Sequence, residues 1–308
     1  MTTNEEKENI FVMYKNKRIV VPFYPQSTVR ALASHVSSSF SIEKDRIRFY
    51  FISTDSQKSV QLKETSLTLQ QSKIRSGMTL HIRDLGRQID KKTSLLIQFG
   101  GSILIYFLVF ANPTLIYRYY NPKYVSKSYT SSQIITFIIW CIHFLKRILE
   151  VLYLHSYSRE TMNVSHLLKG CAYYWSFSLL ISYVICNNDF TPPRFMYQVM
   201  GILMWFLGEY CNFACHYHLS TLRDSLSQDI HPIPTEGFFL KAVCPHYAFE
   251  ALAWYGFNMM TFTFIGVVFN IIGVMRMHHL ARKRHNRYLA EHPSYPSNIP
   301  LMFFSILN

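Results

Sequence analysis

The feature that most constrains this chain is a series of long apolar segments that begins after Thr93. Each segment is mostly apolar over about 20 residues, the length that an α-helix needs to cross the hydrocarbon core of a bilayer. The segments are 94–117, 132–155, 168–187, 196–219, 236–258 and 259–280, and the last two are almost continuous. We therefore expect a multi-pass α-helical membrane domain of about six to seven helices at residues 94–308.

Residues 1–93 lack such segments and are expected to form a separate cytosolic domain. Met1–Asn9 is polar and has no apolar core of a signal peptide, so the first apolar segment is expected to target and anchor the protein. The whole chain is 49% hydrophobic and only 16% charged, whereas soluble proteins average about 25% charged residues. Two domains of different kinds explain this composition.

Short alternating patterns fill the N-terminal region. Apolar residues alternate with polar ones at 10–14, 19–23, 47–51 and 78–82, and Ser27 is a suitable N-cap for a helix with Val29, Leu32 and Val36 on one face. The order of two strands, a helix and further strands resembles a ubiquitin-like β-grasp fold. We interpret this region as a docking or regulatory module without chemistry of its own; the alternative is a purely structural role.

The charges indicate an orientation in the membrane. An even number of spans returns both termini to one side, and the basic run Arg282-Lys283-Arg284 favours the cytosol. The loop at 118–131 is also basic and disagrees with this assignment. The formal net charge of +13 is spread along the chain, which favours a membrane surface or a polyanionic cofactor over nucleic acid.

Ionisable residues inside predicted spans are the strongest functional signal, because each costs about 2.5–3.5 kcal/mol at the bilayer centre. In the second span His143, Lys146, Arg147 and Glu150 share one helical face. The alternative is that the two cations extend to the membrane interface while Glu150 pairs with Lys146. Four polar residues on one face favour a polar cavity.

Two later spans show the same pattern. Glu209, Asn212, His216 and Arg223 lie close to one face of the fourth span. Tyr247, Glu250 and Trp254 do so in the fifth. Convergence of three polar helix faces predicts a buried site.

Several motifs in a fixed order resemble one known family. HFLKRILEVLYLHSYSRETM, CAYYWSF, TPP at 191–193, CPHYAFEALAW and RHNRYLAEHPSYP look like the very-long-chain trans-2-enoyl-CoA reductases, which belong to the steroid 5α-reductase superfamily of the endoplasmic reticulum. The resemblance covers nearly the whole chain. It implies NADPH-dependent reduction of very-long-chain trans-2-enoyl-CoA to saturated acyl-CoA, the last step of the fatty-acid elongation cycle, and reduction of sphingolipid-derived enoyl-CoA as well.

The resemblance also implies roles for individual residues. By position, Lys146 and Tyr247 match the catalytic lysine and tyrosine. Asn212, His216 and Arg223 match a cofactor-binding triplet in which His216 replaces an aspartate, and Arg147 and Tyr288 match further cofactor contacts. His143, Glu150 and Glu250 are expected in the pocket.

The chemistry of the reaction suits these residue types. Hydride addition to Cβ of an enoyl thioester places negative charge on the carbonyl oxygen, and a proton must then reach Cα. We expect Tyr247 to stabilise or protonate the enolate, with Lys146 assisting electrostatically.

Other features limit the alternatives. No GxGxxG follows a strand, so NADPH is expected to bind to helix faces and basic loops; Gly100-Gly101 is interpreted as helix packing. A membrane di-iron desaturase is an alternative that needs repeated histidine clusters as iron ligands. This chain has only two short clusters, His216-Tyr217-His218 and His278-His279, so we expect no metal. HPSY at 292–295 resembles a methyltransferase tail motif. A catalytically silent membrane scaffold that docks partners through its ubiquitin-like module is a further alternative, whereas for an active reductase other elongation-cycle enzymes are expected partners.

Overall fold

The computed structural model describes residues 8–52, 59–62, 66–125, 127–157, 160–225 and 233–303, with side chains given to Leu222 in the fifth of these ranges. It divides into two compact units. The sheet unit comprises Met1–Ser94 and Tyr157–Leu168, and the helical unit comprises Leu95–Ser156 and Lys169–Asn308. The predicted boundary at residue 93 did not anticipate that 157–168 groups with the N-terminal region.

The sheet unit contains a five-stranded mixed sheet in the order β2-β1-β5-β3-β4. Its strands are β1 Asn9–Tyr14, β2 Lys17–Pro22, β3 Ile47–Ile52, β4 Ser59–Gln61 and β5 Thr79–Asp84. β1 and β5 pair in parallel, and the remaining pairs are antiparallel. Helix α1, Val29–Phe40, begins at Thr28, whose side chain caps Ala31 N, rather than at Ser27 as the sequence suggested.

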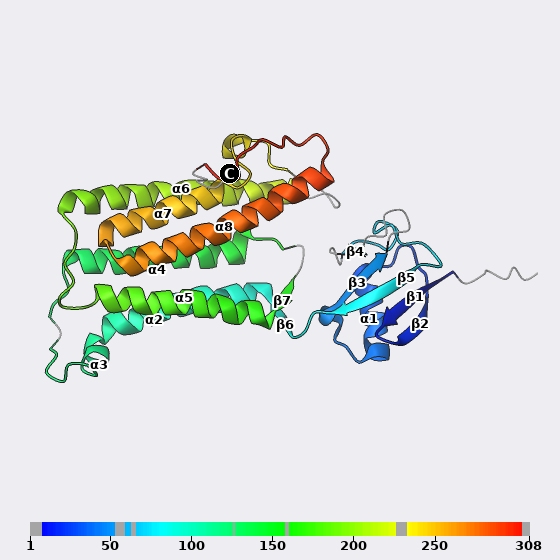
Figure 1. The fold of residues 1–308 in the computed structure, drawn as a ribbon, viewed down its shortest axis with the longest axis horizontal. Helices are drawn as coiled ribbons and strands as arrows, with labels where there is room; N and C mark the ends of the chain where they lie inside the picture. Colours follow the sequence, from blue (N-terminus) through cyan, green and yellow to red (C-terminus); the bar gives the residue numbers. More distant parts are fainter. Residues whose placement is uncertain are drawn as a thin grey trace, which may run out of the picture. The chain divides into compact units, whose positions relative to one another are not determined.

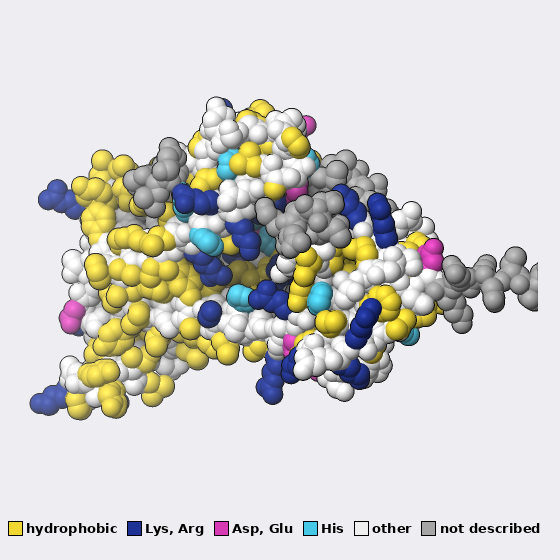
Figure 2. Space-filling view, turned by 45° about the vertical axis from the view of Figure 1, so that its right-hand side comes forward, with side chains coloured by type: hydrophobic (Ala, Val, Ile, Leu, Met, Phe, Trp, Pro, Cys, Tyr) yellow, Lys and Arg dark blue, Asp and Glu magenta, His cyan; other side chains and the backbone are white. Residues whose placement is uncertain are grey.

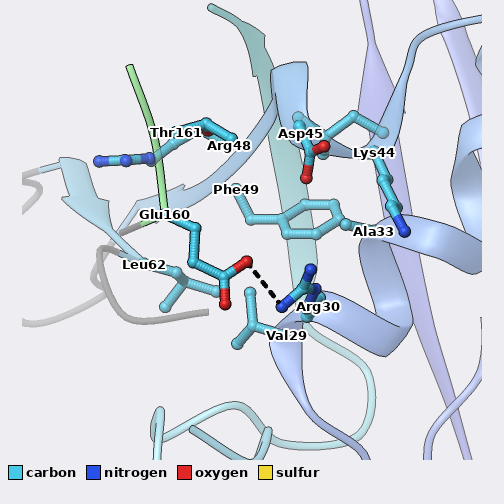
Figure 3. Close-up of a pocket in the computed structure, with 11 residues that line it drawn as sticks. Val29, Arg30, Ala33, Lys44, Asp45, Arg48, Phe49, Leu62, Glu160 and Thr161 are labelled. Carbon is cyan, nitrogen blue, oxygen red and sulfur yellow. Dashed lines mark ion pairs between the residues drawn. The ribbon is translucent and has the colours of Figure 1, made fainter. Parts of the chain in front are cut away.

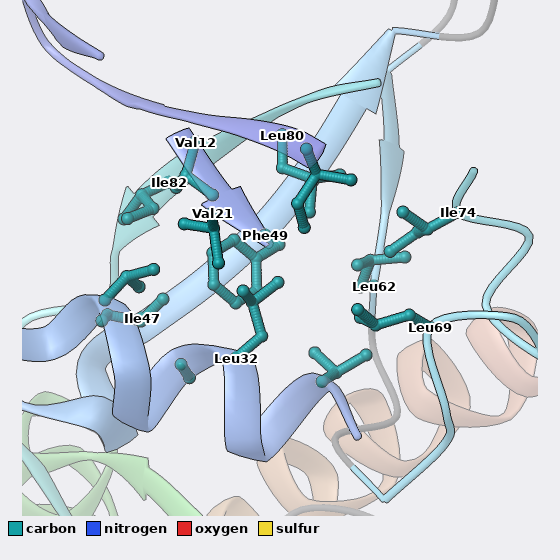
Figure 4. Packing of buried hydrophobic residues seen from close by; sticks show 14 of the residues in the cluster. Val12, Val21, Leu32, Ile47, Phe49, Leu62, Leu69, Ile74, Leu80 and Ile82 are labelled. Carbon is teal, nitrogen blue, oxygen red and sulfur yellow. The ribbon is translucent and has the colours of Figure 1, made fainter. Parts of the chain in front are cut away.

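The alternation seen in the sequence produces one buried core. Val12, Phe49 and Leu80 face Leu32 and the other buried residues of α1, as Figure 4 shows. The short 3₁₀ turn η1, Lys44–Arg46, leads into β3.

An ion pair joins this turn to the end of β5. Arg46 Nη2 lies 2.6 Å from Asp84 Oδ2, and its hydrogen bonds hold the pKa of Asp84 below the usual value. A lowered folded-state pKa stabilises the fold above the unfolded pKa of about 3.9, and this contribution is lost as the pH falls through the folded value. We expect Asp84→Asn to destabilise the sheet unit at neutral pH and to flatten its acid dependence, measured by hydrogen exchange of β3 and β5 amides in the full chain. An acid dependence equal to that of the unmodified chain would contradict this.

A second, two-stranded sheet holds the loop that follows the second predicted span. β6, Gln88–Asp90, pairs antiparallel with β7, Thr161–Asn163. Close by, Glu160 lies 3.0 Å from Arg30 beside Phe49 and Leu62 (Figure 3). Asn163 belongs to the one glycosylation sequon of the sequence, Asn163-Val164-Ser165. Its side-chain Nδ2 donates to Leu85 O, and its Oδ1 accepts from Ser165 N, so both polar atoms of this amide are hydrogen-bonded in the fold.

Six helices of 17 residues or more, counted among the described residues, correspond to the six predicted spans. They are α2 Lys91–Ala111, α4 Ser131–Leu149, α5 Val164–Ile185, α6 Phe195–Ser225, α7 Pro245–Thr261 and α8 Phe264–Glu291. Successive long helices run in alternating directions (Figure 1). A multi-helical domain preceded by a small sheet is therefore confirmed.

Some helix boundaries differ from the predicted ones. α2 stops at Ala111, and the short helix α3, Pro113–Tyr117, follows it. α7 begins at Pro245, nine residues after the predicted start at 236, because a 3₁₀ turn, η3 Gly237–Leu240, precedes it. Phe262, with φ of 45°, ends α7 and separates it from α8.

The helices differ in how well they suit a bilayer. Among the described residues, α2 and α8 are long and apolar enough to cross a membrane on length and composition alone. Large apolar side chains such as Leu104, Phe206 and Met275 are exposed on the helices. Hydrophobic side chains cover the left part of the face in Figure 2, and Lys, Arg and His gather nearer its middle. These surfaces and the two apolar helices indicate a membrane protein.

Helices α6 and α7 approach each other unusually closely. A Cβ atom on Gly256 would lie 2.5 Å from both Gly201 O and Trp205 N, and a Cβ on Gly208 would lie 2.5 Å from Ala253 N. Backbone atoms cannot move aside as a flexible side chain can, so glycine at these positions sets the distance between the two helices.

We expect Gly256→Ala to lower stability by about 1–3 kcal/mol through overpacking, measured as a lowered unfolding temperature in detergent. Gly100→Ala is the matched control, because a Cβ on Gly100 meets nothing within 4 Å. Helix packing was predicted for both glycines, but of the two Gly101 alone packs against another helix, at Trp175. Equal effects of the two substitutions would contradict the interpretation.

Candidate active site

The site is built on the polar face of α4. At Glu150 the helix widens into a π-helical turn, η2 Glu150–Leu154, which ends before His155. Such turns are rare and frequently occur at functional sites. His143 and Glu150 are 3% and 1% exposed, so the face is buried among the other helices.

A carboxylate from α6 joins two of these α4 residues. Glu209 Oε1 lies 2.6 Å from His143 Nδ1, and Glu209 Oε2 lies 2.6 Å from Lys146 Nζ. Lys146 also donates to Asn212 Oδ1 at 2.7 Å, and the Asn212 amide donates to His246 O at 2.8 Å. These bonds connect predicted side chains of α4 and α6 with each other and with the backbone of α7.

Arg147 is held by a different set of partners. Its Nη1 atom lies 2.6 Å from Glu150 Oε2 and 3.1 Å from His216 Nε2. His216 Nδ1 lies 3.3 Å from His155 Nε2. Since the guanidinium can only donate, His216 accepts at Nε2 and carries its proton on Nδ1, toward His155.

Glu150, His155 and His216 also form a group of three potential metal ligands that the sequence did not suggest. Arg147 contacts two of the three residues. The Arg147 guanidinium thus supplies, beside the Glu150 carboxylate, the positive charge that a metal ion would bring.

A cavity of about 200 Å³ opens beside this network. Its polar side is lined by Arg147, Tyr247 and Glu250, together with the predicted residues His143, Asn212 and His216. Its apolar side is lined by aromatic residues, including Phe144, Trp254 and Phe269. Six of the ten predicted site residues therefore line one cavity, which a tyrosine and a guanidinium share with flat apolar side chains.

The other four predicted residues lie elsewhere. Lys146 and Glu150 do not line the cavity and contact it through Asn212 and Arg147. Tyr288 is 4% exposed and packs with Val243 and Cys244 near the C-terminal segment. Arg223 lies on α6, but its side chain is outside the described residues.

The C-terminal segment covers the start of α7. Val243 N donates to Pro300 O at 2.9 Å, and Cys244 N donates to Leu301 O at 3.0 Å. Met302 belongs to the cluster against which Tyr247 packs. This segment therefore supports the helix turn that carries the tyrosine.

Two polar residues on α8 line the cavity although the sequence did not single them out. Asn270 is buried, and Arg276 is exposed. The signal for Asn270 was present, since it is a polar residue inside a predicted span. Arg276 was hidden among the many basic residues toward the end of that helix.

Comparison with known proteins gives this cavity its context. A model of the 3-oxo-5-alpha-steroid 4-dehydrogenase family matches residues 160–303. The "Very-long-chain enoyl-CoA reductase" of Dictyostelium discoideum is 28% identical over 91% of this chain and 92% of its own length. The Caenorhabditis elegans protein named "Probable very-long-chain enoyl-CoA reductase art-1" is 30% identical over 71% of this chain and 72% of its own. The chain belongs to the very-long-chain enoyl-CoA reductase family.

Within this family the likeness extends over both units, because a match over 91% of the chain must include most of the sheet unit. The "Trans-2,3-enoyl-CoA reductase-like" protein of Bos taurus is 32% identical over 75% of this chain and 64% of its own length. Among solved structures, the ubiquitin-like domain of mouse tubulin-specific chaperone e aligns with 28% of the chain at 12% identity and a TM-score of 0.24, too distant to support a fold assignment.

Proposed function

We propose that this enoyl-CoA reductase reduces very-long-chain trans-2-enoyl-CoA with NADPH, as the last step of fatty-acid elongation, and that it accepts sphingolipid-derived enoyl-CoA as well. One observation carries the proposal beyond family membership. Tyr247 and Arg147 line the same cavity as aromatic side chains that suit flat or apolar ligands.

The residues present fit the charge that develops in this reaction. A hydroxyl on Tyr247 can donate a hydrogen bond to the thioester oxygen and stabilise the enolate, or supply the proton for Cα. Arg147, held by Glu150 and His216, places a fixed positive charge in the same cavity. A donor and a cation that are oriented before the reaction lower the cost of reorganisation in the transition state.

Lys146 has a different part in this proposal. Its ammonium is bound by Glu209 and Asn212 and does not line the cavity. We infer that it assists the reaction by holding Asn212 in place.

NADPH, when bound, supplies the hydride for Cβ. The exposed guanidinium of Arg276 at the cavity edge suits a phosphate or pyrophosphate. Asn212 and His216 offer hydrogen bonds deeper in the cavity. We propose that these residues hold the cofactor, together with Arg223 and the basic end of α8.

The remaining proposals concern location and partners. We propose that the protein lies in the endoplasmic reticulum membrane with both termini in the cytosol. An even number of alternating helices places the two termini on the same side, and the basic run Arg282-Lys283-Arg284 favours the cytosolic side. The strand order β2-β1-β5-β3-β4 with one packed helix supports a ubiquitin-like β-grasp fold for the sheet unit. We propose that this unit docks other elongation enzymes.

The test is NADPH consumption by membranes that contain the protein, supplied with trans-2-enoyl-CoAs of graded chain length. We expect turnover that requires both the protein and the double bond, with saturated acyl-CoA as the product. Membranes without the protein are the control. Absence of NADPH oxidation with every chain length would overturn the proposal.

A further inference from the structure

Asn270 is a buried polar residue whose side-chain oxygen has no hydrogen-bond partner among the described residues. It lies on α8 and is 4% exposed. Buried amide oxygens are nearly always paired, because an unpaired one loses its hydration without compensation. In membrane helices asparagine usually bonds a neighbouring helix, yet the part of the chain that the structure describes offers no such bond to Asn270 Oδ1.

The position of Asn270 supplies the missing explanation. The side chain lines the same cavity as Tyr247 and Arg147, and its neighbours on the wall include Trp254 and Phe269. Phe269 has no hydrogen-bonding group in its side chain, and no bond from the Trp254 indole N–H to Asn270 Oδ1 is found among the described residues. A group that enters the cavity, either a ligand or an ordered water, is then the remaining partner for the amide.

A second asparagine shows what a packing role looks like. Asn258 on α7 is also buried, and its Oδ1 likewise lacks a partner among the described residues. It does not line the cavity, and its Oδ1 would lie 2.4 Å from a Cβ atom on Gly266, at the start of α8. Asn258 packs against a helix end, whereas Asn270 lines the cavity.

We propose that the Asn270 amide hydrogen-bonds an amide group of the bound ligand and thereby orients it in the cavity. The proposal rests on the function proposed above. Two ligands of that reaction carry amides with N–H donors, namely the nicotinamide carboxamide of NADPH and the pantetheine arm of the acyl-CoA. The flat aromatic neighbours suit a nicotinamide ring.

The first arm of the test compares NADPH with its reduced 3-acetylpyridine analogue, in which a methyl ketone replaces the carboxamide and removes the N–H donor. The ratio of the two kcat/KM values is measured for the wild type and for Asn270→Leu. Intrinsic differences in hydride-donor strength cancel when the ratios are compared. We expect the wild type to discriminate about tenfold more strongly than the variant, the effect of one well-placed hydrogen bond.

The second arm compares enoyl thioesters of N-acetylcysteamine with enoyl S-alkyl thioesters, which lack the amide. If Asn270→Leu discriminates less than the wild type only between these two thioesters, the hydrogen bond goes to the pantetheine amide. If it discriminates less only between NADPH and the acetylpyridine analogue, the bond goes to the nicotinamide carboxamide. Asn258→Leu is the matched control and should leave both ratios unchanged.

Unchanged ratios in both arms, in an Asn270→Leu enzyme that still turns over, would overturn the inference. If this variant does not fold, Asn270→Ser is measured in the same way. Wild-type protein that oxidises no NADPH refutes the proposed function, whereas wild-type turnover with ratios unaffected by the substitution refutes only the role of Asn270.

Discussion

Replacing Tyr247 with phenylalanine is expected to lower the rate of enoyl-CoA reduction about 10²–10³-fold, the usual effect of removing one donor to a developing oxyanion. The ring packs in the same place, so NADPH binding should be unchanged. Stopped-flow measurement of NADPH oxidation gives the rate, and nicotinamide fluorescence in the same preparation gives cofactor affinity.

The cavity provides its own control for this substitution. Tyr173 also lines it, but its hydroxyl already donates to Phe269 O at 2.9 Å. Tyr173→Phe should therefore change the rate only a few-fold. Near-normal turnover by Tyr247→Phe with intact NADPH binding would show that another group handles the enolate.

Removing the charge of Lys146 is expected to destabilise the helical unit by about 3–5 kcal/mol, because it leaves the buried carboxylate of Glu209 with only part of its compensation. Lys146→Met should also lower activity, since Asn212 loses the ammonium that holds its oxygen. Thermal unfolding in detergent and turnover of the same samples measure the two effects.

A double-mutant cycle separates this pair from general damage. Adding Glu209→Gln to Lys146→Met removes the unpaired charge, so the double variant should be more stable than Lys146→Met alone. Lys241→Met, at an exposed position, should be close to neutral. Strictly additive losses would mean that Lys146 and Glu209 do not stabilise each other.

Periodicity was sufficient to predict the helices and the polar face on α4. Residues spaced by three and four must lie on one side of a helix, and His143, Arg147 and Glu150 are all held within the buried network. The alternating strands of the sheet unit follow from the same kind of rule, since each buried side chain is two residues from the next.

The rest depends on packing between distant segments. Lys146 and Arg147 are adjacent in the sequence but have different surroundings. Lys146 forms an ion pair with Glu209, whereas Arg147 lines the cavity. The π-helical turn at Glu150 changes which residues face inward, and no spacing rule anticipates it. Pairing of β6 with β7 joins segments about 70 residues apart, which local patterns do not encode.

The hydrogen bonds from Val243 and Cys244 to Pro300 and Leu301 have a practical consequence for anyone expressing this enzyme. A purification tag or fluorescent protein fused after Asn308 would join the chain a few residues beyond the segment that supports Tyr247. Weak turnover by such a fusion would then reflect the effect of the tag on this segment and not the activity of the enzyme itself. Tags placed ahead of Met1 avoid this, and assays should be calibrated on that form.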